Sequence, residues 1–503
     1  MAELDPARVL PGLLRRRATE LADRDFLVDT ERGLATYAQF QRRVEAFAVL
    51  LRAHGVGPGD RVAVLLPTSI DEQAVWIACG WLRAVQVPIN PAYRGEMLRH
   101  VLHDSGPRLI VTVAARADEM RQACDAAVFV LELGETLPAG PGVLAGLDDP
   151  KPWDLAAVIY TSGTTGPSKG VLTPWGQLVT GIDAFAEFGP GDVLYAPFAA
   201  FHLGGKVPLQ ILAHWGGTFV FRDGFKTDRF WPDVRAHSCN RAWAFYAMAN
   251  FLWQQPPRPD DRDNPLETVT GGPLLPDYAG FERRFGLQMR TNYGMTEAGW
   301  PIATGGDVVD HRSCGRGRDG YELRIVDDFD AEVGAGQIGE LIIRADRPWS
   351  MNVGYLGRPA DTARAWRNGW YHTGDAFRRD RSGNYFFVDR AKDAVRRRSE
   401  NISSFEVESM VTAHPDVLEC AAIGVPSDDG EEEIKICVVP MPDTKLEAAV
   451  LAEFLMATMP RFMVPRYIEF LDELPKTPTS KVRKVELKRD PFTAGTWDRV
   501  AAR

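Results

Sequence analysis

The chain has 503 residues, a formal net charge of -10, 45% hydrophobic residues and six cysteines. This length exceeds what one hydrophobic core normally serves, so we expect a large body and at least one separately packed domain. The acidic balance disfavours a broad nucleic-acid surface, because phosphate binding needs clustered Lys and Arg.

The cysteines contain no CxxC pair, which disfavours both a disulfide framework and a structural zinc site. The N-terminus has no apolar core of signal-peptide length. No unbroken apolar stretch approaches the ~20 residues of a membrane span. We therefore expect a cytoplasmic protein, a monomer or homodimer, that neither spans a membrane nor binds nucleic acid.

Helical and strand patterns alternate through the first part of the chain. A helical pattern from Tyr37 to Ala53 leads through a Gly-rich turn to the apolar run 61–67. Two further helix–strand repeats follow, with helices over 71–82 and 95–104 and strands over 85–88 and 109–112. This alternation predicts parallel strands with helical crossovers.

The pattern changes in the last third of the chain. Between about 315 and 390 it shortens into strands such as 321–326 and 339–344, separated by Gly-rich turns. Further on, helices near 406–410 and 446–456 flank a strand at 421–425. The predicted fold is therefore α/β. Residues 1–390 form a large N-terminal domain of two α/β subdomains plus a small β-barrel region, and residues 391–503 form a smaller, mobile α+β domain.

The densest chemical signal is the segment YTSGTTGPSKG at 160–170, which follows the strand pattern 155–159. Glycines let backbone N–H groups approach phosphate oxygens, hydroxyls donate hydrogen bonds, and Lys169 offsets charge. The alternatives are a flexible surface loop and a Walker-type loop. The latter needs Ser or Thr after its Lys, whereas Gly170 follows Lys169. The segment therefore predicts polyphosphate binding without the kinase or GTPase mechanism.

Five segments in this order resemble the adenylate-forming superfamily of acyl- and aryl-CoA ligases, luciferases and peptide-synthetase adenylation domains. The segments are 161–170, NYGMTE at 292–297, WYHTGD at 370–375, DRAKD at 389–393 and PKTPTSK at 475–481. The likeness covers nearly the whole chain. Around 396–406 it looks most similar to ligases of the carnitine and crotonobetaine type.

The resemblance implies a role for each matching residue. The implied catalytic residues are Lys481, Glu297, Thr161 and His202, with Glu297 and Thr161 at magnesium and Asp393 at the hinge of the mobile domain. The implied ATP-binding residues are Thr161, Ser162, Gly163, Thr164, Thr165, Gly166, Lys169, Gly271, Gly272, Pro273, Asn292, Tyr293, Gly294, Met295, Thr296, Asp375, Arg390 and Lys481.

Simple physics supports part of this assignment. A carboxylate beside a phosphate site is repelled unless a divalent cation lies between them, which suits Glu297 as a magnesium ligand. Taken alone, Glu297 reads as an exposed acid at a helix start, His202 as a structural histidine, and Lys481 as one of several C-terminal surface lysines. The resemblance, in which His202 matches an aromatic gate, favours the functional interpretation.

The acid substrate is the least determined part. The candidate pocket residues are His202, Lys206, Tyr246, Gly272, Met295 and Trp300. Gly272 stands where the family often has Ala, and we expect the missing methyl group to widen the pocket. An inward Lys206 would pair with a second anionic group on the substrate, although an outward side chain is the stronger expectation.

At two positions the sequence has Ser where similar ligases have Gly, and one further segment matches an unrelated nucleotide-binding motif. Ser399 lies where similar ligases have Gly beside the thiol's entry path, and Ser480 precedes Lys481. The decoy GRGRDG at 315–320 matches GxGxxG but precedes a strand pattern, so we reject a dinucleotide site.

The leading hypothesis is an ATP- and Mg²⁺-dependent ligase that joins a small organic acid to AMP and then transfers it to CoA. An alternative keeps adenylation but uses a carrier-protein thiol, an amine or another nucleophile as acceptor, which Ser399 favours. A remote alternative is a nucleotide-binding protein without catalysis.

Overall fold

The structure is a computed structural model that describes residues 3–138, 144–161, 168–304, 310–390, 395–397, 400–402, 404–427, 432–459, 461, 463–476 and 482–501. The chain divides into two compact units, each described by itself. Unit 1 comprises Met1–Glu322 and Ile343–Tyr371, and unit 2 comprises Leu323–Ile342 and His372–Arg503.

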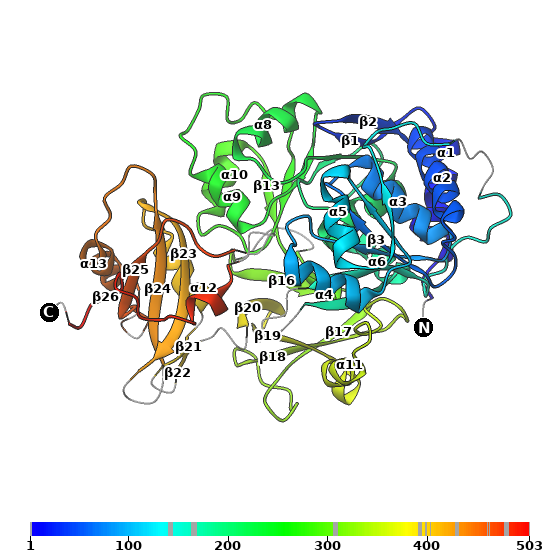
Figure 1. The fold of residues 1–503 in the computed structure, drawn as a ribbon. Coiled ribbons are helices and arrows are strands. Elements are labelled where there is room, and N and C mark those ends of the chain that lie inside the picture. Colours follow the sequence, from blue (N-terminus) through cyan, green and yellow to red (C-terminus); the bar gives the residue numbers. More distant parts are fainter. Residues whose placement is uncertain are drawn as a thin grey trace. The chain divides into compact units, whose positions relative to one another are not determined.

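Unit 1 contains two largely parallel sheets (Figure 1). The first sheet has, in spatial order, β13 (Gln288–Arg290), β12 (Thr268–Thr270), β11 (Arg241–Trp243), β9 (Val193–Tyr195), β10 (Thr218–Phe221), β1 (Asp25–Asp29) and β2 (Gly33–Thr36). The second has β6 (Ala127–Val130), β5 (Leu109–Thr112), β3 (Arg61–Leu65), β4 (Val85–Pro88), β7 (Leu155–Thr161) and β8 (Lys169–Pro174). In each sheet the last-named strand is antiparallel to its neighbour. The two predicted α/β subdomains are confirmed.

Helices cover these sheets. Those of unit 1 are η1 (Pro6–Arg8), α1 (Leu10–Glu20), α2 (Tyr37–Ala53), α3 (Ile70–Trp81), α4 (Gly95–Ser105), α5 (Ala114–Ala123), α6 (Trp175–Ala184), α7 (Leu203–Trp215), α8 (Thr227–Ala236), α9 (Tyr246–Trp253), α10 (Tyr278–Phe285), α11 (Pro359–Ala365) and η2 (Arg367–Gly369). Helix α2 has the predicted bounds because a capping box formed by Thr36 and Gln39 satisfies the backbone at its start.

Alternating side chains of β3 show how the layers form. Val62 and Val64 join the core that also contains residues of α1, α2, α3, α6 and α7, whereas Ala63 and Leu65 join the core under α4 and α5. Successive side chains of a strand point to opposite faces of its sheet, so both faces of β3 are buried. The helices α8, α9 and α10 cover the remaining face of the first sheet.

Antiparallel strands follow the parallel sheets along the chain. Within unit 1, β14 (Asn292–Met295), β15 (Gly299–Ala303) and β16 (Ser313–Gly317) pair consecutively. The strands β17 (Tyr321–Val326), β18 (Ile338–Ala345) and β19 (Tyr371–Arg379) run through the division between the units, and β20 (Asn384–Arg390) pairs with β19 in unit 2. The segment GRGRDG leads from β16 into β17, so the predicted strand after it is confirmed.

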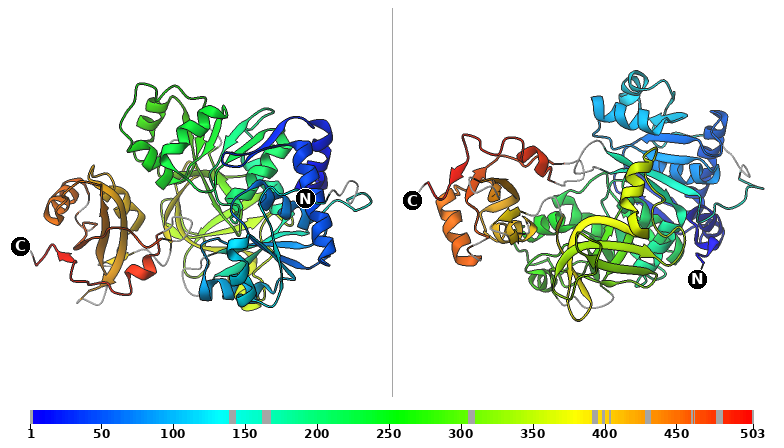
Figure 2. Two further views of the ribbon diagram at one scale, coloured as in Figure 1. Left: turned by 45° about the horizontal axis from the view of Figure 1, so that its top comes forward. Right: turned by 90° about the horizontal axis from the view of Figure 1, so that it is seen from below.

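Unit 2 has its own core. Its remaining elements are β21 (Val395–Arg397), β22 (Glu400–Ile402), α12 (Ser404–Val411), β23 (Val417–Pro426), β24 (Glu432–Pro440), α13 (Ala448–Thr458), β25 (Tyr467–Phe470), α14 (Lys484–Leu487) and β26 (Trp497–Asp498). The strands β23 to β26 form a sheet in chain order (Figure 2). Side chains of α12 and α13 pack on this sheet. The predicted α+β organisation is confirmed.

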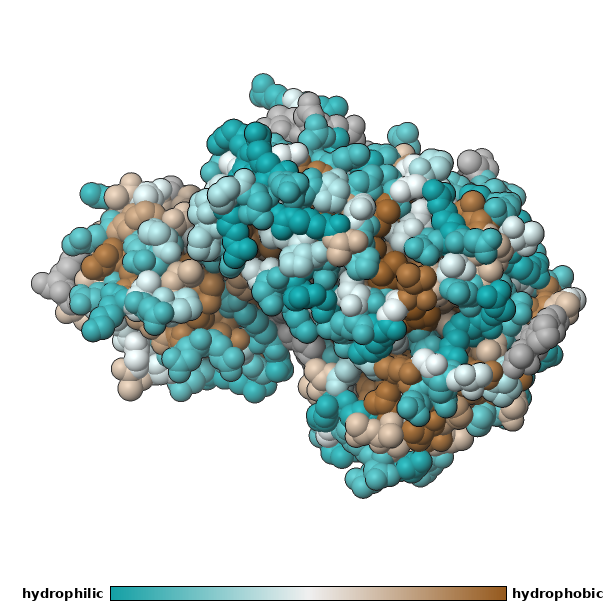
Figure 3. All heavy atoms as spheres, turned by 90° about the horizontal axis from the view of Figure 1, so that it is seen from above, coloured by the Kyte–Doolittle hydropathy of each residue, from teal (hydrophilic) through white to brown (hydrophobic). Residues whose placement is uncertain are grey.

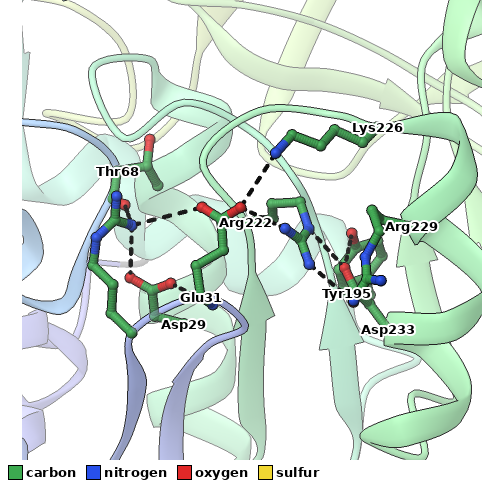
Figure 4. Close-up of polar contacts among 9 residues, drawn as sticks. Asp29, Glu31, Thr68, Tyr195, Arg222, Lys226, Arg229 and Asp233 are labelled. Carbon is green, nitrogen blue, oxygen red and sulfur yellow. Dashed lines mark hydrogen bonds and ion pairs between the residues drawn. The ribbon is translucent and has the colours of Figure 1, made fainter.

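A charged network ties the edge of the first sheet to α8 (Figure 4). The buried guanidinium of Arg222 donates to both oxygens of Asp233, at 2.8 and 3.1 Å, and to Glu31 Oε1 at 2.5 Å. The hydroxyl of Tyr195 also donates to Asp233, at 3.0 Å. These contacts hold the carboxyl ends of β9, β10 and β1 together.

In the face shown in Figure 3, apolar side chains form separate patches within a mainly hydrophilic surface. Among the described residues, no helix combines the length and apolarity that crossing a membrane requires. All six cysteines lie within the described residues and are free thiols.

Candidate active site

The predicted phosphate segment lies between two paired strands. Strands β7 and β8 are antiparallel, and Thr161 lies opposite Lys169 at the end of the ladder. Gly170 lies opposite Tyr160, and a Cβ atom on this glycine would come within 2.6 Å of Val158 Cγ1. The predicted contacts Ser162, Gly163, Thr164, Thr165 and Gly166 lie outside the described residues.

The side chain of Lys169 is held from two directions. Its Nζ lies 3.1 Å from Asp361 Oδ2, and it also lies 5.4 Å from the ring centroid of Tyr355. Hydrogen bonding to Lys169 lowers the pKa of Asp361. These two contacts hold the ammonium group near the end of the β7–β8 ladder, where Lys169 pairs with Thr161.

Glu297 lies in the turn between β14 and β15. Only 8% of it is exposed, and its backbone carbonyl accepts hydrogen bonds from both the backbone N–H and the Nδ2 of Asn352, each at 2.8 Å. The carbonyl of Thr296 accepts from Gln177 Nε2 at 2.6 Å. Gly299, with φ of 68°, allows the chain to turn back into β15. Glu297 is therefore fixed by its backbone.

Two tyrosines that the sequence analysis missed connect these groups. The hydroxyl of Tyr355 donates to Glu297 Oε1 at 3.4 Å and lies 3.1 Å from the hydroxyl of Tyr371. Burial raises the pKa of Tyr371 well above its ordinary value, and its neighbours Glu297 and Tyr293 raise it further. Residues predicted from two separate motifs, Lys169 from one and Tyr293 and Glu297 from the other, are thus brought together in unit 1. No signal in a single sequence marks Tyr355, because only its pairing with β8 places it there.

The residues present fit a magnesium ion. No group of three or more His, Cys, Asp and Glu suited to a metal occurs in the described part of the chain. Mg²⁺ bound with a nucleotide needs no such group, since it takes one or two carboxylates, phosphate oxygens and waters. The buried carboxylate of Glu297 supplies the hard oxygen ligand for that arrangement.

The segment 271–273 makes close backbone contacts. A Cβ atom on Gly271 would lie 1.8 Å from the carbonyl oxygen of Ala244, and one on Gly272 would lie 2.6 Å from that of Asn292. The Cβ direction of Gly272 is therefore filled by the start of β14. The expectation that Gly272 widens a pocket was wrong, because the backbone of Asn292 occupies the space that the methyl group of an alanine would take.

The predicted acyl residues cluster with aromatic side chains. The ring of Trp300 lies 6.5 Å from that of Trp243 and 5.9 Å from that of Phe185. A Cβ atom on Gly294 would come within 2.8 Å of Trp300 Cδ1, so this glycine lets the indole lie across β14. These residues form an apolar region beside the hairpin that carries Glu297.

The other candidate acyl residues lie near the ends of strands and helices. His202 is the N-cap residue of α7, and its ring lies 4.3 Å from that of Phe201. Tyr246 opens α9, and Met295 Sδ accepts a hydrogen bond from the Tyr293 hydroxyl at 3.5 Å.

Lys206 does not point outward as expected. Its side chain is 1% exposed, with Nζ 3.2 Å from Glu72 Oε1 and 4.4 Å from the ring centroid of Trp76. Burial lowers the pKa of Lys206 and raises that of Glu72. Since its charge is already matched by a carboxylate of the same chain, Lys206 is not positioned as a free cation for a substrate.

Unit 2 carries two of the predicted ATP-binding residues, Asp375 and Arg390. Asp375 on β19 lies opposite Arg390 on β20, and Asp375 is buried. Gly374, with φ of 70°, donates its N–H to Glu340 Oε1 at 2.9 Å, and Thr373 Oγ1 accepts from the Asp375 N–H at 3.1 Å. Thr-Gly-Asp is thus a strand segment that hydrogen bonds hold in place, with glycine at the position of positive φ. The predicted hinge Asp393 and catalytic Lys481 lie outside the described residues.

Comparison with known protein families shows the family to which this chain belongs. A model of AMP-binding enzymes matches residues 14–356, and one of the AMP-binding enzyme C-terminal domain matches residues 406–481. The chain belongs to the AMP-binding enzyme family. The predicted class, an adenylate-forming ligase of the acyl-CoA synthetase type, is thereby confirmed.

Individual relatives of this AMP-binding enzyme are ligases. The chain is 30% identical to a probable CoA ligase, CCL9, of Humulus lupulus, covering 94% of this chain and 95% of that protein. It is also 30% identical to the crotonobetaine/carnitine–CoA ligase of Salmonella paratyphi A, covering 90% and 93%.

Solved structures agree with the fold. ATP-bound MatB from Rhodopseudomonas palustris matches with a TM-score of 0.84 and 26% identity, covering 95% of this chain and 98% of that one. The anthranilate CoA ligase AuaEII in complex with anthranoyl-AMP matches with a TM-score of 0.86, covering 97% of each chain, and at 22% identity it supports the fold alone.

Proposed function

We propose that this enzyme activates a small organic acid as its adenylate and transfers the acyl group to the thiol of CoA. The observation that carries the proposal is the convergence of Lys169, Glu297 and Tyr293 around Tyr355 and Tyr371. Two motifs far apart in sequence supply a phosphate cation and, together, a metal carboxylate and an aromatic side chain to one place, and Tyr355 and Tyr371 connect them.

In the first half-reaction, a carboxylate oxygen of the acid attacks the α-phosphorus of ATP. The bond from that phosphorus to the bridging oxygen breaks, and pyrophosphate leaves with the electron pair. Lys169 and the 161–170 segment bind phosphate oxygens, and Lys481 offsets the charge that develops between carboxylate and phosphate. Glu297, with Thr161, holds Mg²⁺, which neutralises phosphate charge when bound.

In the second half-reaction, the CoA sulfur attacks the acyl carbon and AMP leaves. We assign residues 1–390 and 391–503 as the two domains of this cycle, with rotation near Asp393. Asp375 and Arg390 hold the ribose hydroxyls, and Thr296 contacts the α-phosphate. This cycle takes place in the cytoplasm, where the free thiols remain reduced.

The acyl end of the substrate lies among Trp300, His202, Tyr246 and Met295. The aromatic neighbours Trp243 and Phe185 favour an apolar or aromatic acid, while the named relatives suggest crotonobetaine and carnitine as additional candidates. A non-CoA acceptor, such as a carrier-protein thiol or an amine, is favoured by Ser399 alone.

Two assays test the proposal. ATP–pyrophosphate exchange with a panel of aliphatic, aromatic and betaine acids should detect adenylation, and Glu297→Gln should abolish it. AMP release with the active acid should then depend on CoA. Absence of exchange with every acid would contradict adenylation, while CoA-independent turnover would support the alternative acceptor.

A further inference from the structure

We propose that Tyr355 is a positioning residue that holds the phosphate-binding lysine and the metal-binding carboxylate in one arrangement. This inference rests on the proposed roles of Lys169 and Glu297. The ring of Tyr355 contacts Lys169 and its hydroxyl contacts Glu297, so one side chain spans both groups.

The backbone of Tyr355 is in register with the strand that carries Lys169. Tyr355 pairs with Val171 of β8, and the neighbouring residues add backbone hydrogen bonds of 3.0 Å from Leu172 to Gly354 and 2.8 Å from Leu356 to Gly170. The Tyr355 N–H donates to Thr362 Oγ1 at 2.9 Å. The ring therefore keeps a fixed position relative to β8.

The same segment fixes Glu297. Asn352, three residues before Tyr355, donates twice to the Glu297 carbonyl, and its Oδ1 accepts the Gly354 N–H at 2.8 Å. The segment 352–355 thus holds both the backbone and the carboxylate of Glu297. Because this segment also pairs with β8, it fixes the position of the Glu297 carboxylate relative to the β7–β8 hairpin.

The hydrogen bonds that link Tyr371, Tyr355 and Glu297 all donate in the direction of the carboxylate. The Tyr355 hydroxyl donates to Glu297, so its oxygen accepts from Tyr371. The hydrogen bond from Tyr355 orients the carboxylate of Glu297, as outer hydrogen bonds orient the ligands of other metal sites.

The ring and the hydroxyl make separable contributions. The ion pair of Lys169 with Asp361 is partly exposed, and such pairs and cation–π contacts each contribute about 1 kcal/mol or less. Together these contacts restrict the conformations of the long, flexible side chain of Lys169. Removing the hydroxyl should affect only the metal carboxylate, whereas removing the ring should also release Lys169.

The test compares Tyr355→Phe and Tyr355→Leu with Tyr195→Phe. The control also loses a buried hydrogen bond to a carboxylate, because the Tyr195 hydroxyl donates to Asp233 at 3.0 Å. Calorimetry measures ATP binding with EDTA and with Mg²⁺, thermal unfolding reports stability, and pyrophosphate exchange gives the Mg²⁺ concentration at half-maximal rate.

For Tyr355→Phe we expect an increase of about fivefold to tenfold in the Mg²⁺ requirement, with the Kd for ATP in EDTA unchanged. Tyr355→Leu should in addition raise that Kd about fivefold. Tyr195→Phe should change neither quantity. Wild-type Mg²⁺ dependence in Tyr355→Phe, or equal shifts in the control, would overturn the inference. Failure of the wild-type protein to bind ATP would instead overturn the proposed function.

Discussion

The Nζ of Lys206 lies 3.2 Å from Oε1 of Glu72 in the interior of unit 1. The pair joins the N-terminal part of α7 to the start of α3. Two further contacts fasten the same region, because Gln73 Nε2 donates to the Gly205 carbonyl at 2.9 Å and the Ala200 N–H donates to Thr68 Oγ1 at 3.2 Å. The segment that carries His202 is therefore held by buried polar groups.

Lys206→Met should lower the free energy of unfolding by about 3–5 kcal/mol, because it leaves a buried carboxylate without its cation. The double variant Lys206→Met/Glu72→Leu should recover much of that loss, since a matched apolar pair avoids the buried charge. Urea denaturation measures both. Arg99→Met, which removes the exposed pair with Glu96, is the control and should cost less than about 1 kcal/mol. Equal losses in the single and double variants would contradict this account.

Glu31→Gln should have a pH-dependent effect on stability. Burial alone would raise the pKa of Glu31, but Lys226 and Arg222 lower it below its ordinary value (Figure 4). A carboxylate with a lowered folded-state pKa stabilises the fold above its unfolded pKa of about 4.3, and this stabilisation disappears as the pH falls through the folded value.

The difference in unfolding free energy between wild type and Glu31→Gln should therefore be about 1 kcal/mol at pH 7 and smaller at about pH 3. Urea denaturation at the two pH values measures it. A difference that grows on acidification would contradict the assigned sign.

Gly272→Ala should destabilise unit 1 by about 1–3 kcal/mol and slow pyrophosphate exchange, because the added Cβ meets the Asn292 carbonyl oxygen at 2.6 Å. Thermal unfolding and the exchange assay measure the two effects. Gly189→Ala is the control, since its Cβ would have no neighbour within 4 Å. Unchanged stability in Gly272→Ala would show that β14 moves away without cost.

Lys481→Ala should abolish formation of the adenylate while leaving thioester formation from a supplied acyl-adenylate largely intact. The physical reason is that the lysine offsets charge only while pyrophosphate leaves. Rapid-quench assays of the two half-reactions separate them, with Lys476→Ala as a nearby control that pairs with Glu419. Similar losses in both half-reactions would contradict the assigned role.

The order of the elements and the class of chemistry could be predicted from the amino-acid sequence. Hydrophobic periodicity over Tyr37–Ala53 and 321–326 gave elements with the observed bounds, because local pattern and capping agree there. The motifs containing Lys169, Glu297 and Asp375 identified the family, since each combines residue types that nucleotide chemistry needs at fixed spacing.

The directions of individual side chains, and the groups that they contact, became known only from the three-dimensional arrangement of the chain. Lys206 is buried because Glu72, 134 positions earlier, supplies its counter-charge. The backbone carbonyl of Asn292 occupies the space into which a side chain at position 272 would extend. Tyr355 reaches Glu297 because its own backbone pairs with Val171 of β8. Each of these facts depends on contacts between distant segments, and a single sequence encodes such contacts only through the complete fold.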